Sequence, residues 1–205
     1  MLPASEVRAR ILDIVRRRQK PGAGSSPEFL RRRSAVKQWP DLTGVLSSIR
    51  WATVGGVATR HYAPERTTID LDVLVEHTAR SKVHQQLQAA GYRYLGELAI
   101  GGSTWSAPDG TTLDVIETAE PWAASALEQA QQNRDLQGLP VLPLPYFTLM
   151  KLRSGRGQDV ADLMRMLGQA NQSQLDAVRD VVRRYEPDSL EDVESMTTLG
   201  RMELE

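Results

Sequence analysis

Two aspartates inside one short apolar run constrain this chain more than any other feature of its sequence. The run is Thr-Ile-Asp-Leu-Asp-Val-Leu-Val, residues 68–75, and its apolar, β-branched residues predict a strand. Side chains at i and i+2 of a strand point to one face, so Asp70 and Asp72 project together while Leu71 and Val73 face the core. Two like charges at this spacing repel, and a divalent cation reverses the sign of that interaction. Hard carboxylate oxygens suit magnesium or manganese, so the pair predicts a metal site.

A third carboxylate sits in the same kind of environment further along the chain. Asp114 lies in Leu-Asp-Val-Ile, again an acid embedded in an apolar strand pattern. Three acids on neighbouring strands could hold two metal ions about 3.5–4 Å apart, the arrangement used for in-line phosphoryl or nucleotidyl displacement. Asp70, Asp72 and Asp114 are therefore the predicted metal ligands.

A glycine pair precedes the first two acids. Gly55 and Gly56 follow the strand-like run Trp-Ala-Thr-Val and begin a helical stretch. Glycines at such a place let the backbone approach a phosphate and present N–H groups at a helix N-terminus. Thirteen residues separate Gly56 from Asp70, which leaves room for one short helix and a return strand. The pattern predicts a phosphate-binding turn beside the acids.

The order of predicted elements indicates an α+β fold: a small mixed β-sheet with N-terminal helices and a helical C-terminal part. We expect one domain over residues 1–120, with a basic helical N-terminal extension, and a helical domain with an acidic tail over 121–205. The last twenty residues could be a docked helix or a loose tail. The predicted strands are 51–56, 68–75, 92–98, 103–107 and 111–117, with an edge strand within the proline-rich stretch 138–145. The predicted helices are 5–19, 27–39, 41–50, 79–91, 122–133, 146–155, 158–169 and 173–185.

Composition excludes several kinds of site. The chain has 205 residues, no cysteine and three histidines, which rules out disulfides, thiolate metal sites and cysteine nucleophiles. No apolar run approaches the ~20 residues of a membrane span, and the first residues lack the apolar core of a signal peptide. We therefore expect a soluble, cytoplasmic protein with no membrane partner.

The net charge of −1 conceals two charged ends. Residues 1–39 carry ten basic and three acidic residues, whereas residues 186–205 carry one basic and seven acidic residues. The basic stretch could meet a nucleic-acid backbone. It could equally consist of solvated helix faces, or pair with the acidic tail.

The segment GGVATRHYAPERTTIDLDVLV (55–75), together with Leu-Asp-Val at 113–115, resembles the nucleotidyltransferase superfamily of the DNA polymerase β type. The resemblance covers residues 51–117 and lacks none of the three acids. Arg66-Thr-Thr-Ile-Asp70 is similar to the Arg-x-Thr-x-Asp-x-Asp form of AbiEii-type toxins, MenT-like toxins and some small antibiotic nucleotidyltransferases.

A second segment, KLRSGRGQDVADL (151–163), is similar to the C-terminal motif of AbiEii-type proteins, with Gln158 where a basic residue is common. By charge alone, Lys151, Arg153 and Arg156 could neutralise a triphosphate, with Asp159 and Asp162 on one helix face positioning them. Ordinary surface ion pairs on a helix are the alternative reading.

The resemblance implies transfer of a nucleoside monophosphate from an NTP to an acceptor hydroxyl, with release of pyrophosphate. It implies two Mg²⁺ ions, with Mn²⁺ as the alternative, held by the three aspartates, and Asp114 assisting deprotonation of the acceptor. The implied catalytic residues are Asp70, Asp72, Asp114 and Lys151, and the implied nucleotide contacts are Gly55, Gly56, Arg66, Thr68, Lys151, Arg156 and Asp159.

Three functions stay open at this level. The first is a toxin that modifies tRNA or a protein and is controlled by a cognate antitoxin. The second is a small-molecule nucleotidyltransferase that inactivates an antibiotic. The third is a non-catalytic member that binds a nucleotide or a partner, against which the intact set of three acids argues.

Overall fold

The computed structural model describes residues 4–18, 38–63 and 68–204, which fall into two compact units. We call residues 38–61 and 68–143 the sheet unit, and residues 4–18, 62–63 and 144–204 the helical unit. The domain boundary expected at residue 120 stays a prediction.

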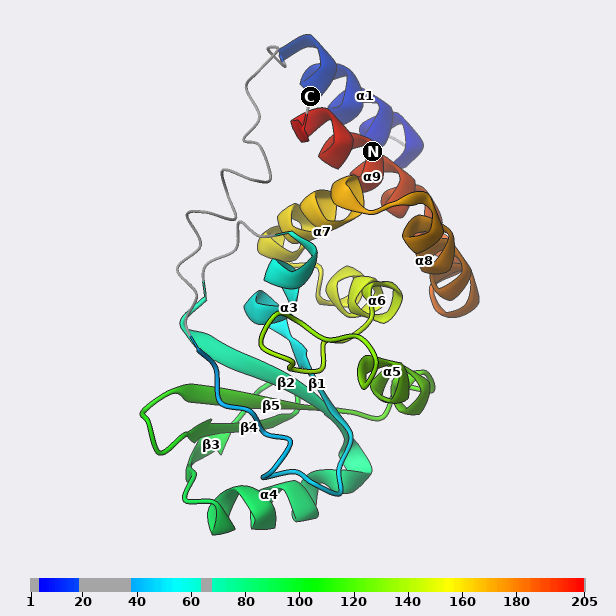
Figure 1. The fold of residues 1–205 in the computed structure, drawn as a ribbon. Helices are drawn as coiled ribbons and strands as arrows, with labels where there is room; N and C mark the ends of the chain where they lie inside the picture. Colours follow the sequence, from blue (N-terminus) through cyan, green and yellow to red (C-terminus); the bar gives the residue numbers. More distant parts are fainter. Residues whose placement is uncertain (1–3, 19–37, 64–67, 205) are drawn as a thin grey trace. The chain divides into compact units, whose positions relative to one another are not determined.

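The sheet unit is built on a five-stranded mixed sheet, seen in Figure 1. Its strand order is β1-β2-β5-β4-β3, with β2 and β5 parallel and the other neighbours antiparallel. The strands are β1 (Trp51–Val54), β2 (Asp70–Glu76), β3 (Arg93–Glu97), β4 (Gly102–Ser106) and β5 (Thr112–Thr118).

Helices lie on both sides of this sheet. Helix α4 lies on one face and α3 on the other (Figure 1). The fully buried Val83 and Leu87 of α4 join a core with the odd-numbered residues of β2, which alternation directs to that face. Helix α5 packs against β1 and β2. The helical segments of this unit are α3 (Gly55–Tyr62, except for Tyr62 itself), the 3₁₀ turn η1 (His77–Ala79), α4 (Arg80–Ala89) and α5 (Ala123–Ala130).

The helical unit contains α1 (Ala4–Arg18), α6 (Leu144–Ser154), α7 (Gly157–Gln169), α8 (Gln172–Tyr185), the 3₁₀ turn η2 (Pro187–Ser189) and α9 (Leu190–Leu204). An Asn171–Gln174 capping box begins α8. Helix α7 packs against α9, so the acidic C-terminal stretch is a docked helix. Arg8 of α1 donates to Glu191 and Asp192 of α9 at 2.6 and 2.7 Å.

The predicted α+β class is confirmed, and the strands expected around the three acids form as β1, β2 and β5. The helix expected over 27–39 lies largely outside the described residues. No helix in the described ranges is long and apolar enough to cross a membrane.

The helix expected over 41–50 is wrong. This segment forms turns, in which the Asp41 carboxylate accepts a hydrogen bond from the Thr43 N–H at 2.8 Å. This bond is of the kind that begins a helix, and the Leu46 N–H donates to the Leu42 carbonyl at 2.7 Å, so a single helical turn forms but does not continue. Gly44, Ser47 and Ser48 have low helix propensity, which disfavours a longer helix here. The helix-like spacing in this segment comes only from the buried Leu42 and Leu46.

The edge strand expected within 138–145 is also wrong. The stretch forms one isolated bridge to β1, in which the Thr53 N–H donates to the Pro140 carbonyl at 2.7 Å and the Leu142 N–H to the Thr53 carbonyl at 3.1 Å. Pro140 has no N–H to donate to the Trp51 carbonyl, which limits the ladder on one side, and the helices that begin at Gly55 and Leu144 end it on the other.

Candidate metal centre

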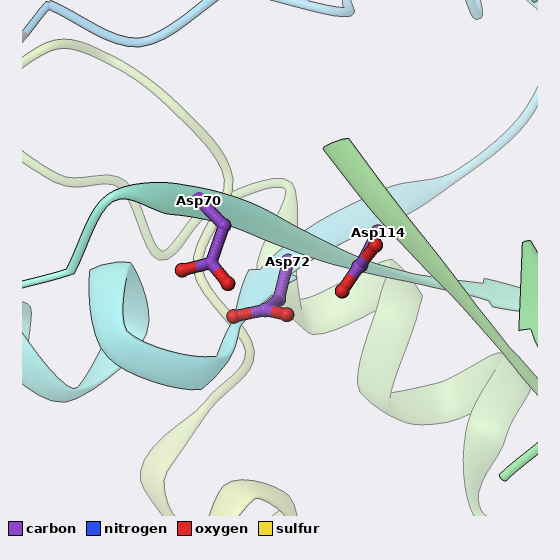
Figure 2. Close-up of side chains that lie close together, drawn as sticks. All are labelled: Asp70, Asp72 and Asp114. Carbon is purple, nitrogen blue, oxygen red and sulfur yellow. The ribbon is translucent and has the colours of Figure 1, made fainter. Parts of the chain in front are cut away.

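The three predicted aspartates come together because β2 and β5 are parallel neighbours in matched register. Asp72 pairs with Asp114, and Asp70 pairs with Thr112. Paired residues on adjacent strands point to one face, so all three carboxylates lie on the same side of the sheet, as Figure 2 shows. One oxygen from each carboxylate lies within 4.8 Å of the others, and each residue is half-buried.

The chemistry of this acidic triad fits a divalent cation. Asp114 Oδ1 is buried and has no hydrogen-bond partner among the described residues. An unsatisfied buried carboxylate oxygen costs free energy, and repulsion among three clustered anions adds to that cost. Both costs are relieved by a hard cation, for which carboxylate oxygens are the preferred ligands. Asp70, Asp72 and Asp114 are thus the residues that could hold Mg²⁺ or Mn²⁺.

Gly55 turns the chain sharply between β1 and α3, directly against Asp72. Its φ of +58° lies in the left-handed region that favours glycine. A Cβ at this position would lie 1.8 Å from Asp72 Oδ2, because Val54 of β1 pairs with Asp72 of β2. Any other residue here would displace the carboxylate.

Gly56 lies against Thr68, the residue two positions before Asp70. A Cβ on Gly56 would lie 2.5 Å from the Thr68 Cβ. The Thr68 hydroxyl donates to Asp70 Oδ1 at 2.5 Å, a contact that was not predicted from the sequence. The period-2 spacing of Thr68 and Asp70 was the signal that could have revealed it.

Lys151 belongs to the helical unit, where it forms a buried ion cluster. Its Nζ donates to Asp159 Oδ1 at 2.8 Å and to Asp162 Oδ2 at 2.7 Å, and Lys151 is 5% exposed. Burial opposes ionisation of Asp159, but hydrogen bonds from Lys151, Ser154 and Arg156 outweigh it and hold the pKa of Asp159 below its ordinary value. The Lys151 ion pairs are buried and join α6 to α7 within the helical unit, so they are not the surface ion pairs that the sequence left open as an alternative.

The remaining predicted nucleotide contacts fall in different places. Arg66 lies outside the described residues. Arg156 has a largely exposed side chain whose Nε donates to Asp159 Oδ2 at 2.8 Å. As nucleotide contacts, Lys151, Arg156 and Asp159 stay predictions.

A second group of acids, Glu117 and Glu97, lies on the α4 face of the sheet, and the Arg80 guanidinium already pairs with both. The Glu117 carboxylate of β5 lies 3.0 Å from His77 Nδ1 and 3.6 Å from Arg80 Nη1. Arg80 also donates to both Glu97 oxygens, at 2.8 and 2.7 Å. A guanidinium inside the group takes the place that a metal would need, so this group contrasts with the acidic triad.

The sequence matches no known protein-family description and no curated protein. Among solved structures, the chain is similar to ANT(2'')-Ia in complex with adenylyl-2''-tobramycin, with 15% identity over 78% of this chain and 93% of that chain and a TM-score of 0.42. It is also similar to a solution structure of the antibiotic-resistance factor ANT(2'')-Ia, with 14% identity over 79% and 93% of the two chains and a TM-score of 0.42. The Cid1 poly(U) polymerase gives 13% identity over 80% of this chain and 55% of that chain, with a TM-score of 0.32. At these TM-scores the similarity carries no weight for function, so a functional assignment has to rest on the acidic triad.

Proposed function

We propose that the protein is a metal-dependent nucleotidyltransferase, which moves a nucleoside monophosphate from an NTP to an acceptor hydroxyl. The observation that carries this proposal is the acidic triad: three half-buried aspartates on adjacent strands, with one buried oxygen unsatisfied among the described residues. A cluster of this kind is the usual protein contribution to metal-assisted displacement at phosphorus.

Each predicted residue has a role in this reaction. Asp70, Asp72 and Asp114 would hold two Mg²⁺ ions, or Mn²⁺, which neutralise the triphosphate and activate the acceptor hydroxyl. Asp114 accepts the hydroxyl proton, the acceptor oxygen bonds to the α-phosphorus, and the α–β phosphoanhydride bond breaks to release pyrophosphate.

The chain also supplies groups that would bind the nucleotide. The N–H groups at the start of α3 would meet its phosphates. Arg66, Lys151 and Arg156 are the proposed cations for the triphosphate, with Asp159 holding Lys151 in place.

We propose a macromolecular acceptor, tRNA or a protein, as for a toxin controlled by an antitoxin. Support comes from the strand next to the acidic triad, where Thr104 pairs with Asp114 and Ser106 pairs with Thr112. These half-buried residues share the face of the acidic triad and offer neutral hydroxyls. A cationic antibiotic would be recognised by further carboxylates, and none lies on this face of β4 or β5 beyond Asp114.

The basic N-terminal stretch gives partial support for tRNA. Arg8 pairs with α9, while Arg10 and Arg17 pair with acids of their own helix. Arg16 is exposed. If tRNA binds through this stretch, its affinity will fall steeply as salt rises, and binding that is absent or independent of salt would remove tRNA from the proposal.

The test is to incubate the protein with each α-labelled NTP, Mg²⁺, and total tRNA or a cell lysate, and to identify the labelled product. The intact protein should label a macromolecule and release pyrophosphate, and the double variant Asp70→Asn/Asp72→Asn should do neither. Glu128→Gln is the matched control, since it removes one charge from an exposed site on α5. Turnover that persists in the double variant would refute the metal-dependent mechanism, whereas a labelled antibiotic in place of a macromolecule would favour the small-molecule alternative.

A further inference from the structure

We propose that Gly55, Gly56 and Thr68 form a carboxylate seat, in which the Thr68 hydroxyl positions Asp70 and the two glycines leave the space that Thr68 and Asp72 occupy. The proposal rests on the metal centre of the proposed function. It gives these three residues a role in holding the ligands of the acidic triad, distinct from the nucleotide contacts expected from the sequence.

Thr68 acts on Asp70 through one short hydrogen bond. Its Oγ1 lies 2.5 Å from Asp70 Oδ1 and 3.3 Å from the Asp70 carbonyl oxygen. Hydrogen bonds from a hydroxyl to a carboxylate fall at about 2.5–2.7 Å and are among the stronger ones in proteins. A donor on one carboxylate oxygen restricts rotation about the Cβ–Cγ bond, so the orientation of Asp70 depends on Thr68.

The position of Thr68 depends in turn on Gly56. A Cβ on Gly56 would lie 2.5 Å from the Thr68 Cβ, 2.8 Å from Oγ1 and 3.1 Å from Cγ2. All three heavy atoms of the Thr68 side chain therefore lie against the volume that any other residue at position 56 would need. A substitution at Gly56 should displace Thr68, and with it the hydroxyl that holds Asp70.

Gly55 makes the corresponding space for Asp72. A Cβ here would lie 1.8 Å from Asp72 Oδ2 and 2.5 Å from Asp72 Cγ. The two adjacent glycines thus accommodate the two ligands of β2: Gly55 contacts Asp72 directly, and Gly56 acts on Asp70 through Thr68. This arrangement gives a steric reason for a glycine pair at this turn that does not depend on a bound phosphate.

The test measures Mn²⁺ affinity by electron paramagnetic resonance on the full chain, which reports metal binding without any turnover. Thr68→Val keeps the shape but loses the donor, and it should weaken Mn²⁺ binding by about 10-fold or more, the usual effect of losing a partner that orients a metal ligand. Thr68→Ser keeps the donor and should stay within about 3-fold of the intact protein, on the same reasoning. Thr78→Val, at an exposed threonine of η1, is the matched control and should leave the affinity unchanged.

Gly56→Ala should reproduce the loss seen in Thr68→Val. Because both substitutions act on one contact, the double variant should bind Mn²⁺ about as well as either single variant, with the two effects far from additive. Thermal unfolding of each metal-free variant identifies any that have lost the fold, and the Thr68→Ser comparison then decides between a hydroxyl effect and a packing effect.

Equal Mn²⁺ affinity of the intact protein and Thr68→Val would overturn the proposal, as would equal losses in Thr68→Val and Thr68→Ser. An intact protein that binds no Mn²⁺ would overturn it as well. Pyrophosphate release is measured separately: if Mn²⁺ binds as expected but no NTP is consumed with any acceptor, the proposed function fails while the carboxylate seat stands.

Discussion

At the scale of single residues, the acidic triad carries a cost in stability that a bound cation would offset. Asp70, Asp72 and Asp114 place three negative charges within reach of one another, and one of their oxygens is buried without a partner among the described residues. Sites of this kind carry a stability cost that a bound ligand offsets.

Asp114→Asn should therefore raise the stability of the metal-free protein while removing its response to metal. The substitution is nearly isosteric and removes one of three mutually repelling charges, so we expect a gain of about 1 kcal/mol in the free energy of unfolding. Thermal unfolding with and without Mn²⁺ checks this, with Glu128→Gln as the control for a charge removed elsewhere. A variant less stable than the metal-free intact protein, or one that Mn²⁺ still stabilises fully, would contradict it.

At the scale of elements, α7 and α9 approach so closely that their backbones touch. A Cβ on Gly200 would lie 1.8 Å from the Met164 carbonyl oxygen, and one on Gly168 would lie 2.4 Å from the Gly200 carbonyl carbon. The atoms that would clash are main-chain atoms, which cannot rotate away as a side chain can. The acidic C-terminal helix is docked on α7 because two glycines permit this approach.

Gly200→Ala should destabilise the helical unit by about 1–3 kcal/mol or more, since the added methyl forces α7 and α9 apart. The matched control is Gly157→Ala at the start of α7, where an added Cβ meets nothing within 4 Å. That control should be neutral or stabilise slightly, because alanine restricts the unfolded chain. Urea denaturation followed by circular dichroism compares the two, and equal midpoints would refute the close-packing argument.

At the scale of the whole molecule, a bound metal ion and a low pH should change the stability of different units. The acidic triad belongs to the sheet unit, and the Lys151 cluster belongs to the helical unit. The pKa of Asp159 is held below its ordinary value of 3.8 in the folded state, so the unfolded chain takes up this proton at a higher pH than the folded one. The stability contributed by Asp159 is complete above the unfolded pKa and is lost as the pH falls through the folded pKa.

Two spectroscopic signals can separate these effects. All four tryptophans, Trp39, Trp51, Trp105 and Trp122, lie in the sheet unit, so tryptophan fluorescence reports that unit, whereas far-ultraviolet circular dichroism is dominated by the helical unit. Mn²⁺ at neutral pH should raise the unfolding midpoint seen by fluorescence. Lowering the pH from about 5 to about 3 should lower the midpoint seen by circular dichroism, and Asp159→Asn should weaken that dependence. Coincident transitions under all conditions would show that the two units unfold together.

The sequence by itself determined the features that depend on local backbone geometry. The period-2 alternation of a strand places Asp70 and Asp72 on one face, and the left-handed turn after β1 requires Gly55. Local spacing was a poor guide at 41–50, where Gly44, Ser47 and Ser48 disfavour a helix longer than a single turn, and at 138–145, where Pro140 lacks the N–H that a longer ladder with β1 would need.

Only the tertiary structure decided which distant segments meet. Strand β5 lies beside β2 and in register with it, which brings Asp114 to Asp72, although 41 residues separate them in the chain. The contacts of Gly56 with Thr68 and of Lys151 with Asp162 likewise depend on packing that no local pattern encodes. The physical reason is that backbone geometry sets which way a side chain points, whereas the pairing of strands and helices sets what it meets there.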